Sequence, residues 1–286
     1  VGVSTVTVSK ALSGQKGVSE EVREKIHRIA EELGYQQPSA ARKSQNRKSY
    51  NIGILISERF LVKYESFYWQ MYQAVATRAT AKECFTMLEV IGVAEEENSK
   101  MPKLVQERKV DGIIVIGKMM DAYLQHLNTE AGIPVIYLDY YNGREASDSV
   151  ISNSYYGTYE LTYYLYRMGH RKIAYVGTLL ATESITDRYF GYQKALLELG
   201  LEQKKEWVLD DRHIETGEID TVNMLQIPKD MPTAFVCNCD LTASFLIKKL
   251  RDNGYRVPED ISVVGFDNYL YPGLSDIQIT TYEVDL

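Results

Sequence analysis

The run VGVSTVTVSKALSG at residues 1–14, followed by VSEEVREKIHRIAEELGY at residues 18–35, decides how this chain is interpreted. Ser4 is a favourable N-cap, because its hydroxyl can accept a hydrogen bond from an unpaired backbone N–H in a first helical turn. We therefore predict a helix from Ser4 to about Leu12. One face of it points inward (Val8, Ala11 and Leu12) and the other points outward (Thr5, Val6, Ser9 and Lys10). Its small side chains make the helix slim enough for a DNA major groove.

Local propensity alone does not explain this helix. Thr and Val lose rotamer freedom in a helix, so an ordinary helical hairpin is the weaker interpretation. The complete run resembles the helix-turn-helix headpiece of the LacI/GalR family of bacterial transcription regulators. The resemblance implies a DNA-binding headpiece at residues 1–35, preceded by one further helix before Val1.

In that family the second headpiece helix lies in the major groove. The DNA-binding residues that the resemblance implies here are Ser4, Thr5, Val6, Thr7, Ser9 and Lys10. Thr5, Val6 and Lys10 are expected nearest the base edges, and the other three near phosphates or the backbone of the turn. Lys10 stands where relatives often place arginine. Lysine cannot form the bidentate hydrogen bonds of arginine, so we expect weaker discrimination between bases.

The charge of the chain is unevenly distributed. Residues 1–50 carry nine Lys and Arg against five Glu, a net charge of +4, whereas the remainder carries −11 and the whole chain −7. A basic module on an acidic body should bind phosphate through the module, with an affinity that falls steeply as salt rises. Double-stranded DNA is therefore the expected macromolecular partner.

Length and composition indicate a folded protein. The chain has 286 residues, 45% of them hydrophobic and 11% aromatic, which is enough for a sizeable core. No apolar run is long enough to span a bilayer, so we expect no membrane partner. Three cysteines without framework spacing suit a reducing compartment and predict a cytoplasmic location. For Cys237 and Cys239, a structural or ligand-lining role is favoured over a metal site, because no second Cys or His pair lies nearby.

Residues 36–49, QQPSAARKSQNRKS, are polar and basic, so they predict a linker. Family members use this stretch as a hinge helix that orders on DNA and inserts a leucine into the minor groove. Here Lys43, Ser44 and Gln45 stand where that leucine is expected. Either this hinge does not intercalate or the chain lacks the residues that do so.

From Tyr50 onward, short apolar runs alternate with helical segments, which is the rhythm of parallel βαβ units. The predicted strands are 52–56, 85–88, 112–117, 134–138, 172–177, 234–237 and 261–266. The predicted helices lie near 66–82, 99–109, 121–131, 154–168, 187–200, 217–225 and 240–253. We expect an α/β fold with two lobes, each a doubly wound parallel sheet, and a small-molecule site in the cleft between them.

Motifs in this body also resemble the LacI/GalR effector-binding core, which is similar to periplasmic sugar-binding proteins. They are MGHRKIA at 168–174, Asp187-Arg188 with Gly191-Tyr192, VPEDISVVGFD at 257–267 and ITT at 279–281. The resemblance implies a core over residues 50–286, in which the chain crosses between lobes three times. Lobe one is expected over about 50–169 and lobe two over about 170–279, with a return to lobe one from about 280. Further helix and strand are expected after Leu286.

The implied effector site lies at strand ends that face the cleft. Asp267 matches a family carboxylate that accepts hydrogen bonds from the ligand, and Arg188 matches a family arginine whose planar fork holds two neighbouring oxygens. Asp139 is a weaker match, and Phe67 or Tyr68 supplies the aromatic face that sugars need. A loop N-cap is the competing interpretation for Asp267, and a surface position on a helix is the one for Arg188.

Two departures from the family pattern fall near this site. Cys239-Asp240 stands where many relatives carry Asn-Asp, and Ser152-Asn153 stands where they carry Asp-Asn. Cys239 therefore joins the expected effector contacts. The position of the site carries over better than the identity of its ligand, for which a polyhydroxylated sugar is the expectation.

Six tyrosines crowd the predicted helix at 154–168: Tyr155, Tyr156, Tyr159, Tyr163, Tyr164 and Tyr166. A stacking platform or cofactor site is one interpretation. A helix packed on the sheet with half-exposed aromatic side chains is favoured. We expect neither chemistry nor a cofactor there.

Together these features predict a sequence-specific DNA-binding transcriptional regulator, a repressor controlled allosterically by a small molecule bound between the lobes. A lone headpiece buries little surface, so we expect a homodimer on a palindromic operator. The alternative is a sugar-binding solute receptor without a DNA-binding role. An enzyme ranks third, because the chain lacks HExxH, GxSxG and a phosphate-cradling glycine loop. Its four scattered histidines form no nucleophile–base set: His27, His126, His170 and His213.

Overall fold

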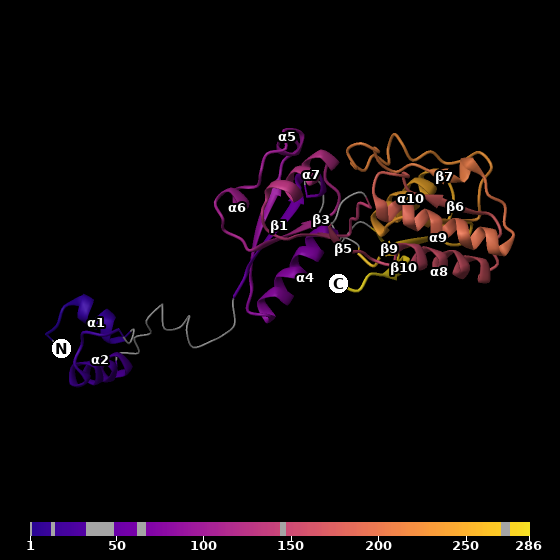
Figure 1. The fold of residues 1–286 in the computed structure, drawn as a ribbon. Coiled ribbons are helices and arrows are strands. Elements are labelled where there is room, and N and C mark those ends of the chain that lie inside the picture. Colours follow the sequence, from indigo (N-terminus) through magenta and orange to yellow (C-terminus); the bar gives the residue numbers. More distant parts are fainter. Residues whose placement is uncertain (1, 13–14, 33–48, 62–66, 144–146, 270–274) are drawn as a thin grey trace. The chain divides into compact units, whose positions relative to one another are not determined.

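The computed structural model describes residues 2–12, 15–32, 49–61, 67–143, 147–269 and 275–286. The chain divides into two compact units, a head of residues 1–49 and a core of residues 50–286 (Figure 1). None of the helices in the described ranges is both long and apolar enough to cross a membrane.

The head contains helices α1 (Thr5–Leu12) and α2 (Glu20–Glu32). The backbone N–H of Thr7 donates to Oγ of Ser4 at 3.2 Å, so Ser4 caps α1 as predicted. Ala11 and Ile26 are buried where the two helices pack. The predicted outward face of α1 is exposed, and its predicted inward face is buried or half-buried.

Arg23 of α2 closes the turn that follows α1. Its guanidinium donates to the carbonyl oxygens of Ala11 at 3.2 Å and Gln15 at 3.0 Å. The last carbonyls of a helix have no partner within it. Arg23 therefore satisfies a carbonyl at the end of α1 and ties the two helices together.

The predicted linker lies outside the described residues, apart from Ser49. This includes Lys43, Ser44 and Gln45, where the hinge departs from the family pattern. Intercalation by the hinge therefore stays untested.

The first sheet of the core has five parallel strands in the order β2-β1-β3-β4-β5. They are β1 (Asn51–Ser57), β2 (Phe85–Ile91), β3 (Gly112–Ile116), β4 (Val135–Leu138) and β5 (Asp148–Val150). The connecting helices are η1 (Glu58–Phe60), α4 (Phe67–Ala81), α5 (Val93–Glu97), α6 (Lys103–Gln106) and α7 (Asp121–Glu130). Side chains alternate along a strand. Ile54 and Ile56 therefore pack with Met71 of α4, while Leu55 packs with Leu124 of α7.

The second sheet also has five parallel strands, in the order β10-β9-β8-β6-β7. They are β6 (Ile173–Val176), β7 (Val208–Leu209), β8 (Ala234–Cys237), β9 (Ser262–Asp267) and β10 (Thr280–Glu283). The helices are α8 (Ser154–Arg167), α9 (Glu183–Leu199), η2 (Lys205–Trp207) and α10 (Asp240–Asp252). Val236 of β8 packs with α8 and α9, whereas Phe235 packs with α10 on the opposite face.

Helices α8 and α9 approach each other closely. A Cβ on Gly191 would lie 2.0 Å from the carbonyl oxygen of Tyr155, so this packing requires glycine. The hydroxyls of Tyr159 and Tyr163 on α8 donate to the carboxylate of Glu198 on α9 at 2.7 and 3.3 Å. The tyrosine-rich helix is thus packed and partly exposed, as its favoured interpretation predicts.

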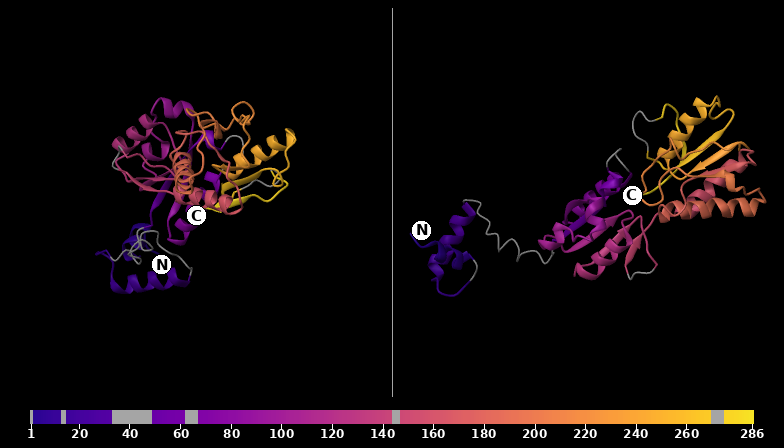
Figure 2. Two further views of the ribbon diagram at one scale, coloured as in Figure 1. Left: turned by 90° about the vertical axis from the view of Figure 1, so that its right-hand side faces the viewer. Right: turned by 90° about the horizontal axis from the view of Figure 1, so that it is seen from above.

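Two predicted lobe boundaries are wrong. Helix α8 packs on α9 and contacts β8, β9 and β10, so the second lobe begins near residue 154 instead of 170. Strand β10 pairs in parallel with β9, so the chain does not return to the first lobe at about 280. The ring of Tyr282 stacks on Phe266 at 5.2 Å and holds β10 on the second sheet. Leu286 then packs against the first lobe, and Figure 2 shows the C-terminal end between the two lobes.

Two predicted helices also differ from the structure. Near 99–109, α6 is only four residues long and starts after Pro102, which has no N–H to continue a preceding helix. Residues 217–225 form no helix: Ile219 makes an isolated antiparallel bridge with Arg212, and residues 221–224 form turns. There the carboxylate of Asp220 accepts the backbone N–H of Asn223 at 3.2 Å, a local bond that competes with helix formation.

Candidate functional site

A cavity of about 430 Å³ lies inside the core, lined by residues of both lobes. All six residues predicted to contact an effector line it: Phe67, Tyr68, Asp139, Arg188, Cys239 and Asp267. The first three belong to the first lobe and the last three to the second. Parallel strands present their carboxyl ends at one edge of a sheet, so residues far apart in sequence converge at this cavity.

The two predicted carboxylates follow strands in a strained backbone. Asp139 comes directly after β4 with φ +59°, and Asp267 ends β9 with φ +99°. Residues other than glycine rarely adopt such angles, and each costs on the order of 1–3 kcal/mol. The sharp turn at each strand end places a carboxylate in the cavity wall.

Arg188 of α9 is held on three sides. Its Nη1 donates to the backbone oxygen of Asn238 at 2.6 Å, and its Nη2 lies 3.2 Å from Oδ1 of Asp267. Its guanidinium carbon lies 3.9 Å from the ring centroid of Phe266, within cation–π distance. Arg188 is 4% exposed, so it is not the surface residue of the competing interpretation.

Burial dominates the electrostatics of Asp267. It raises the pKa of this carboxyl to about 7, although the Arg188 guanidinium opposes the shift. The carboxyl therefore changes charge near neutral pH. It can accept hydrogen bonds when ionised and donate one when protonated.

Tyr68 and Asp139 form the polar part of the first-lobe wall. The Tyr68 hydroxyl donates to Oδ2 of Asp139 at 3.3 Å. Burial raises the pKa of Asp139 and that of Tyr68. The ring of Tyr68 meets Phe60 edge to face, with centroids 4.8 Å apart, so an apolar surface adjoins the carboxylate.

Three buried polar atoms of residues in this wall lack a hydrogen bond within the described residues. They are Nε of Arg188, Oδ1 of Asp139 and Oδ1 of Asp267, and the last of these lies in an ion pair with Arg188. Buried polar groups in proteins are almost always hydrogen-bonded. One donor and two acceptors left without such a bond beside one cavity indicate a site that a polar ligand completes.

Sequence reasoning missed a second charged cluster in the second lobe. Nε and Nη2 of Arg212 donate to the two carboxylate oxygens of Asp211 at 3.0 and 2.8 Å. Asp211 also accepts from the Thr242 hydroxyl at 2.6 Å and from Nδ2 of Asn238 at 2.8 Å. Burial alone would raise the pKa of Asp211, but Arg212 and these hydrogen bonds hold that pKa well below its usual range. The sequence offers little indication of this cluster, because the preceding strand β7 is only two residues long and has no recognisable apolar run.

The departure at Cys239 has a local structural consequence. Cys239 is the N-cap of α10, and its thiol accepts the backbone N–H of Thr242 at 3.5 Å. Burial raises the pKa of the thiol, so the uncharged form lines the cavity. The neighbouring Asn238 serves the charged cluster, because its Oδ1 accepts from Nη2 of Arg212 at 2.9 Å. Within the described ranges, no group of three or more His, Cys, Asp or Glu is placed to hold a metal ion.

A buried carboxylate orders the first-lobe rim of the cavity, and it was also missed. Glu96 is 1% exposed and accepts from Nη2 of Arg59 at 2.6 Å and from the backbone N–H of Met120 at 2.9 Å. Arg59 in turn lines the cavity. The acidic run that contains Glu96 reads as an exposed helix face, so nothing in it signalled burial.

Two polar contacts join the lobes at the start of α9. Nζ of Lys118 lies 3.3 Å from the carboxylate of Glu183, and the Tyr141 hydroxyl donates to Asp187 at 3.0 Å. Lys118 and Tyr141 belong to the first lobe, whereas Glu183 and Asp187 belong to α9. The helix that carries Arg188 is thus linked to both sides of the cavity.

In the head, the predicted DNA-binding residues cluster on α1 and its cap. Thr5, Val6, Ser9 and Lys10 are exposed, and Val6 is 61% exposed. The hydroxyls of Ser4 and Thr7 lie 2.9 Å apart at the start of the helix. The helix therefore presents small polar groups and one apolar group to solvent.

Known proteins resemble both units. Residues 1–38 match the family model described as bacterial regulatory proteins, lacI family, and residues 162–286 match the periplasmic binding protein-like domain. The HTH-type transcriptional repressor PurR of Glaesserella parasuis serovar 5 (strain SH0165) is 30% identical over 276 residues, which cover 94% of this chain and 78% of the relative. The chain belongs to the LacI family of bacterial regulatory proteins.

Solved structures of LacI-type regulators share the fold. A transcriptional regulator CelR–cellobiose complex is 26% identical, with a TM-score of 0.63 over 93% of this chain and 80% of that one. A lac repressor dimer bound to operator and an anti-inducer is 22% identical, with a TM-score of 0.64 over 94% and 80% of the two chains. The LacI-family chain is a DNA-binding transcriptional regulator with an effector-binding core, and not a solute receptor without a DNA-binding role.

Proposed function

We propose that this LacI-family regulator is a homodimeric repressor that reads a palindromic operator with α1. A sugar-like effector that fills the cavity weakens or strengthens its binding to the operator. The observation that carries the proposal is the cavity itself, where Asp139, Arg188 and Asp267 converge beside aromatic rings. Its walls offer donors, acceptors and apolar surface, which suits a polyhydroxylated ring. The likeness to a cellobiose-bound regulator supports a sugar, and the likeness to PurR supports repression.

The exposed face of α1 supports major-groove recognition. Val6 is an exposed apolar side chain among small polar ones, and a valine methyl suits contact with the thymine methyl group. Lys10 reaches guanine acceptors, and the hydroxyls of Ser4, Thr7 and Ser9 serve phosphates or the turn. One head of this size binds weakly, so two heads on a symmetric operator supply the required affinity.

The effector acts through lobe closure. The contacts Lys118–Glu183 and Tyr141–Asp187 tie the lobes together at α9, next to Arg188. A ligand that binds one lobe arrangement better than another shifts the equilibrium between them. Coupling of this kind is commonly worth about 1–3 kcal/mol. Within this proposal the chain has no catalytic role and acts in the cytoplasm.

Duplex selection from a random pool by the full-length protein tests DNA reading. We expect a palindromic consensus with half-sites about one helical turn apart, and a binding constant that falls steeply with salt. The Val6→Ser variant should weaken selection at one base pair. Val222→Ser is the matched control, because Val222 is an equally apolar and 80% exposed side chain in the core.

If no duplex is enriched over a polyanion competitor, the DNA-reading proposal is contradicted.

A second experiment tests the effector site: thermal unfolding of the full-length protein is measured with a panel of sugars and nucleobases. A stabilising compound should lose its effect in Asp267→Ala but keep it in Asp276→Ala, whose carboxylate pairs with Arg251 on the surface. Equal stabilisation of both variants would contradict the assigned site.

A further inference from the structure

We propose that the effector carries an anionic group, a carboxylate or a phosphate, and that Arg212 together with Arg188 selects for it. This inference deepens the proposed function and rests on it. Neither the sequence pattern nor the general shape of the cavity requires a second arginine in the wall. The structure places one there, in a setting that fixes its orientation.

Arg212 is built into the wall by Asp211. The carboxylate of Asp211 is 0% exposed and holds Nε and Nη2 of Arg212 with two parallel hydrogen bonds. Asp211 is itself fixed by the backbone N–H of Thr178 at 3.1 Å and by the Thr242 hydroxyl at 2.6 Å. The edge of the guanidinium that carries Nε and Nη2 is therefore held by Asp211, which fixes the orientation of the side chain. The third guanidinium nitrogen, Nη1, makes no hydrogen bond within the described residues, and the Arg212 side chain lines the cavity.

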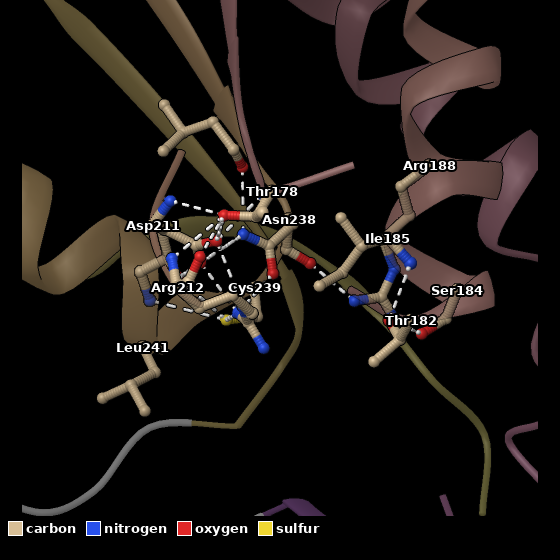
Figure 3. Close-up of polar contacts among 12 residues, drawn as sticks. Thr178, Thr182, Ser184, Ile185, Arg188, Asp211, Arg212, Asn238, Cys239 and Leu241 are labelled. Atoms are coloured by element: carbon tan, nitrogen blue, oxygen red, sulfur yellow. Dashed lines mark hydrogen bonds and ion pairs between the residues drawn. The ribbon is translucent and has the colours of Figure 1, made fainter. Parts of the chain in front are cut away.

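Arg188 presents a second unsatisfied donor to the same region. Its Nη1 donates to the backbone oxygen of Asn238, while Nη2 of Arg212 donates to the side-chain oxygen of the same residue. Figure 3 shows the two arginine side chains converging on Asn238. Nε of Arg188 is buried without a hydrogen-bond partner. The wall thus holds two guanidinium groups one asparagine apart, each with a donor to spare.

Two fixed guanidinium groups suit an anion better than a hydroxyl. Planar forks match the geometry of carboxylate and phosphate oxygens, and bonds between charged partners are about twice as strong as neutral ones. A neutral sugar needs one such fork to hold two neighbouring hydroxyls. A second fork, oriented by a dedicated buried carboxylate, adds most when the ligand brings negative charge.

The carboxylates around the cavity do not cancel this preference. Asp211 pairs with Arg212, Asp267 pairs with Arg188, and the buried Glu96 pairs with Arg59. Burial raises the pKa of Asp139 and brings that of Asp267 to about 7, so Asp267 is partly protonated near neutral pH and repels an anion less than a fully ionised carboxylate does. Glu58 and Glu218 also line the cavity, and Glu218 is exposed at its rim. The aromatic residues Phe60, Phe67 and Tyr68 line the same cavity, and ionic contacts are stronger beside such apolar surface than in bulk water.

Calorimetric titration of the full-length protein tests the inference with matched probes. Each neutral sugar, glucose among them, is compared with its phosphate ester and its sugar acid, and inorganic phosphate is titrated alone. We expect the tightest probe to be anionic and to bind at least about tenfold more tightly than its neutral parent. In Arg212→Gln that ratio should fall to about one, whereas Arg212→Lys, which keeps the charge but not the fork, should retain part of it.

Two further variants separate recognition from folding. Arg256→Gln is the matched control, because Arg256 and Asp260 form a similar two-bond ion pair on the surface of the second lobe, and it should keep the full ratio. The double variant Asp211→Asn/Arg212→Gln leaves no unpaired buried carboxylate and should also lack the anion preference. If it folds and retains the preference, the inference is overturned.

The remaining outcomes divide the inference from the proposed function. The inference of an anionic effector is overturned by either of two results: a neutral sugar binds as tightly as its anionic derivatives, or no anionic probe in the panel binds. If that neutral sugar also changes operator affinity, the proposed function stands without the inference. If an anionic probe binds through Arg212 but leaves operator affinity unchanged, the inference stands and allosteric control fails.

Discussion

The head and the core carry their functional residues in opposite ways. In the head, the six predicted DNA-binding residues lie within positions 4–10, and most are exposed. In the core, the predicted effector residues range from Phe67 to Asp267, and Asp139 and Arg188 are 7% and 4% exposed. An exposed head residue outside the cap, such as Val6, can therefore change without disturbing the fold, whereas a cavity residue supports structure and recognition together.

The pH dependence of stability should show this difference most strongly. Burial raises the pKa of Asp267 from 3.8 to about 7, so the folded protein retains a proton that the unfolded chain releases. The resulting stabilisation is fully present below about pH 4 and is lost as the pH rises toward 7. The free energy of unfolding of the wild type, relative to Asp267→Asn, should fall by at most about 4 kcal/mol over this range. Chemical denaturation at each pH measures it, and parallel curves for the two proteins would contradict the burial of an ionisable Asp267.

Gly191→Ala should separate core stability from DNA binding. The added methyl group would lie 2.0 Å from the carbonyl oxygen of Tyr155 and force α8 and α9 apart. We expect a loss of about 2–3 kcal/mol in the free energy of unfolding of the core. Gly143→Ala is the control, because its Cβ would meet no atom within 4 Å. An unchanged melting temperature for Gly191→Ala would show that the two helices are not packed as described.

Lys10→Ala tests the head alone and has the smallest expected effect. It should cost about 1–2 kcal/mol in operator binding and relax the preference at one base pair, with no change in core stability. Competition between operator and random DNA measures both effects. Lys248→Ala removes an exposed lysine from the core and serves as the charge-matched control. Equal losses on operator and random DNA would show that Lys10 contacts phosphate only.

The same contrast explains what the sequence predicts. The capped helix α1 was predictable, because Ser4 and the outward side chains stand within one short run. Most strands of the two sheets were also predictable from their apolar runs. Asp139, Arg188 and Asp267 were placed through motif resemblance, whereas Phe67 and Tyr68 were expected as the aromatic face of a sugar site and Cys239 as a departure from the family pattern. Local patterns do not encode the topology that brings Tyr68 and Arg188 to one cavity.

The errors have physical causes as well. Strand β7 is only two residues long, so the charged cluster of Asp211 and Arg212 that follows it gave no signal. Helix α8 looks like the last helix of the first lobe in sequence, but its packing with α9 assigns it to the second. Strand β10 was placed in the wrong lobe because the sequence does not show which strand it pairs with. In the structure it pairs with β9, and Tyr282 of β10 stacks on Phe266 of β9.

Coupling between the two units is tested most directly by operator affinity at increasing effector concentration. Fluorescence anisotropy of a labelled operator would be recorded for the full-length protein and for Asp139→Asn, whose substitution lies in the cavity wall. We predict a change in operator affinity of about 5- to 150-fold at saturating effector, with the response abolished or shifted to much higher concentration in Asp139→Asn. An effector that binds the cavity while operator affinity stays constant would contradict a regulator in which the core controls the head.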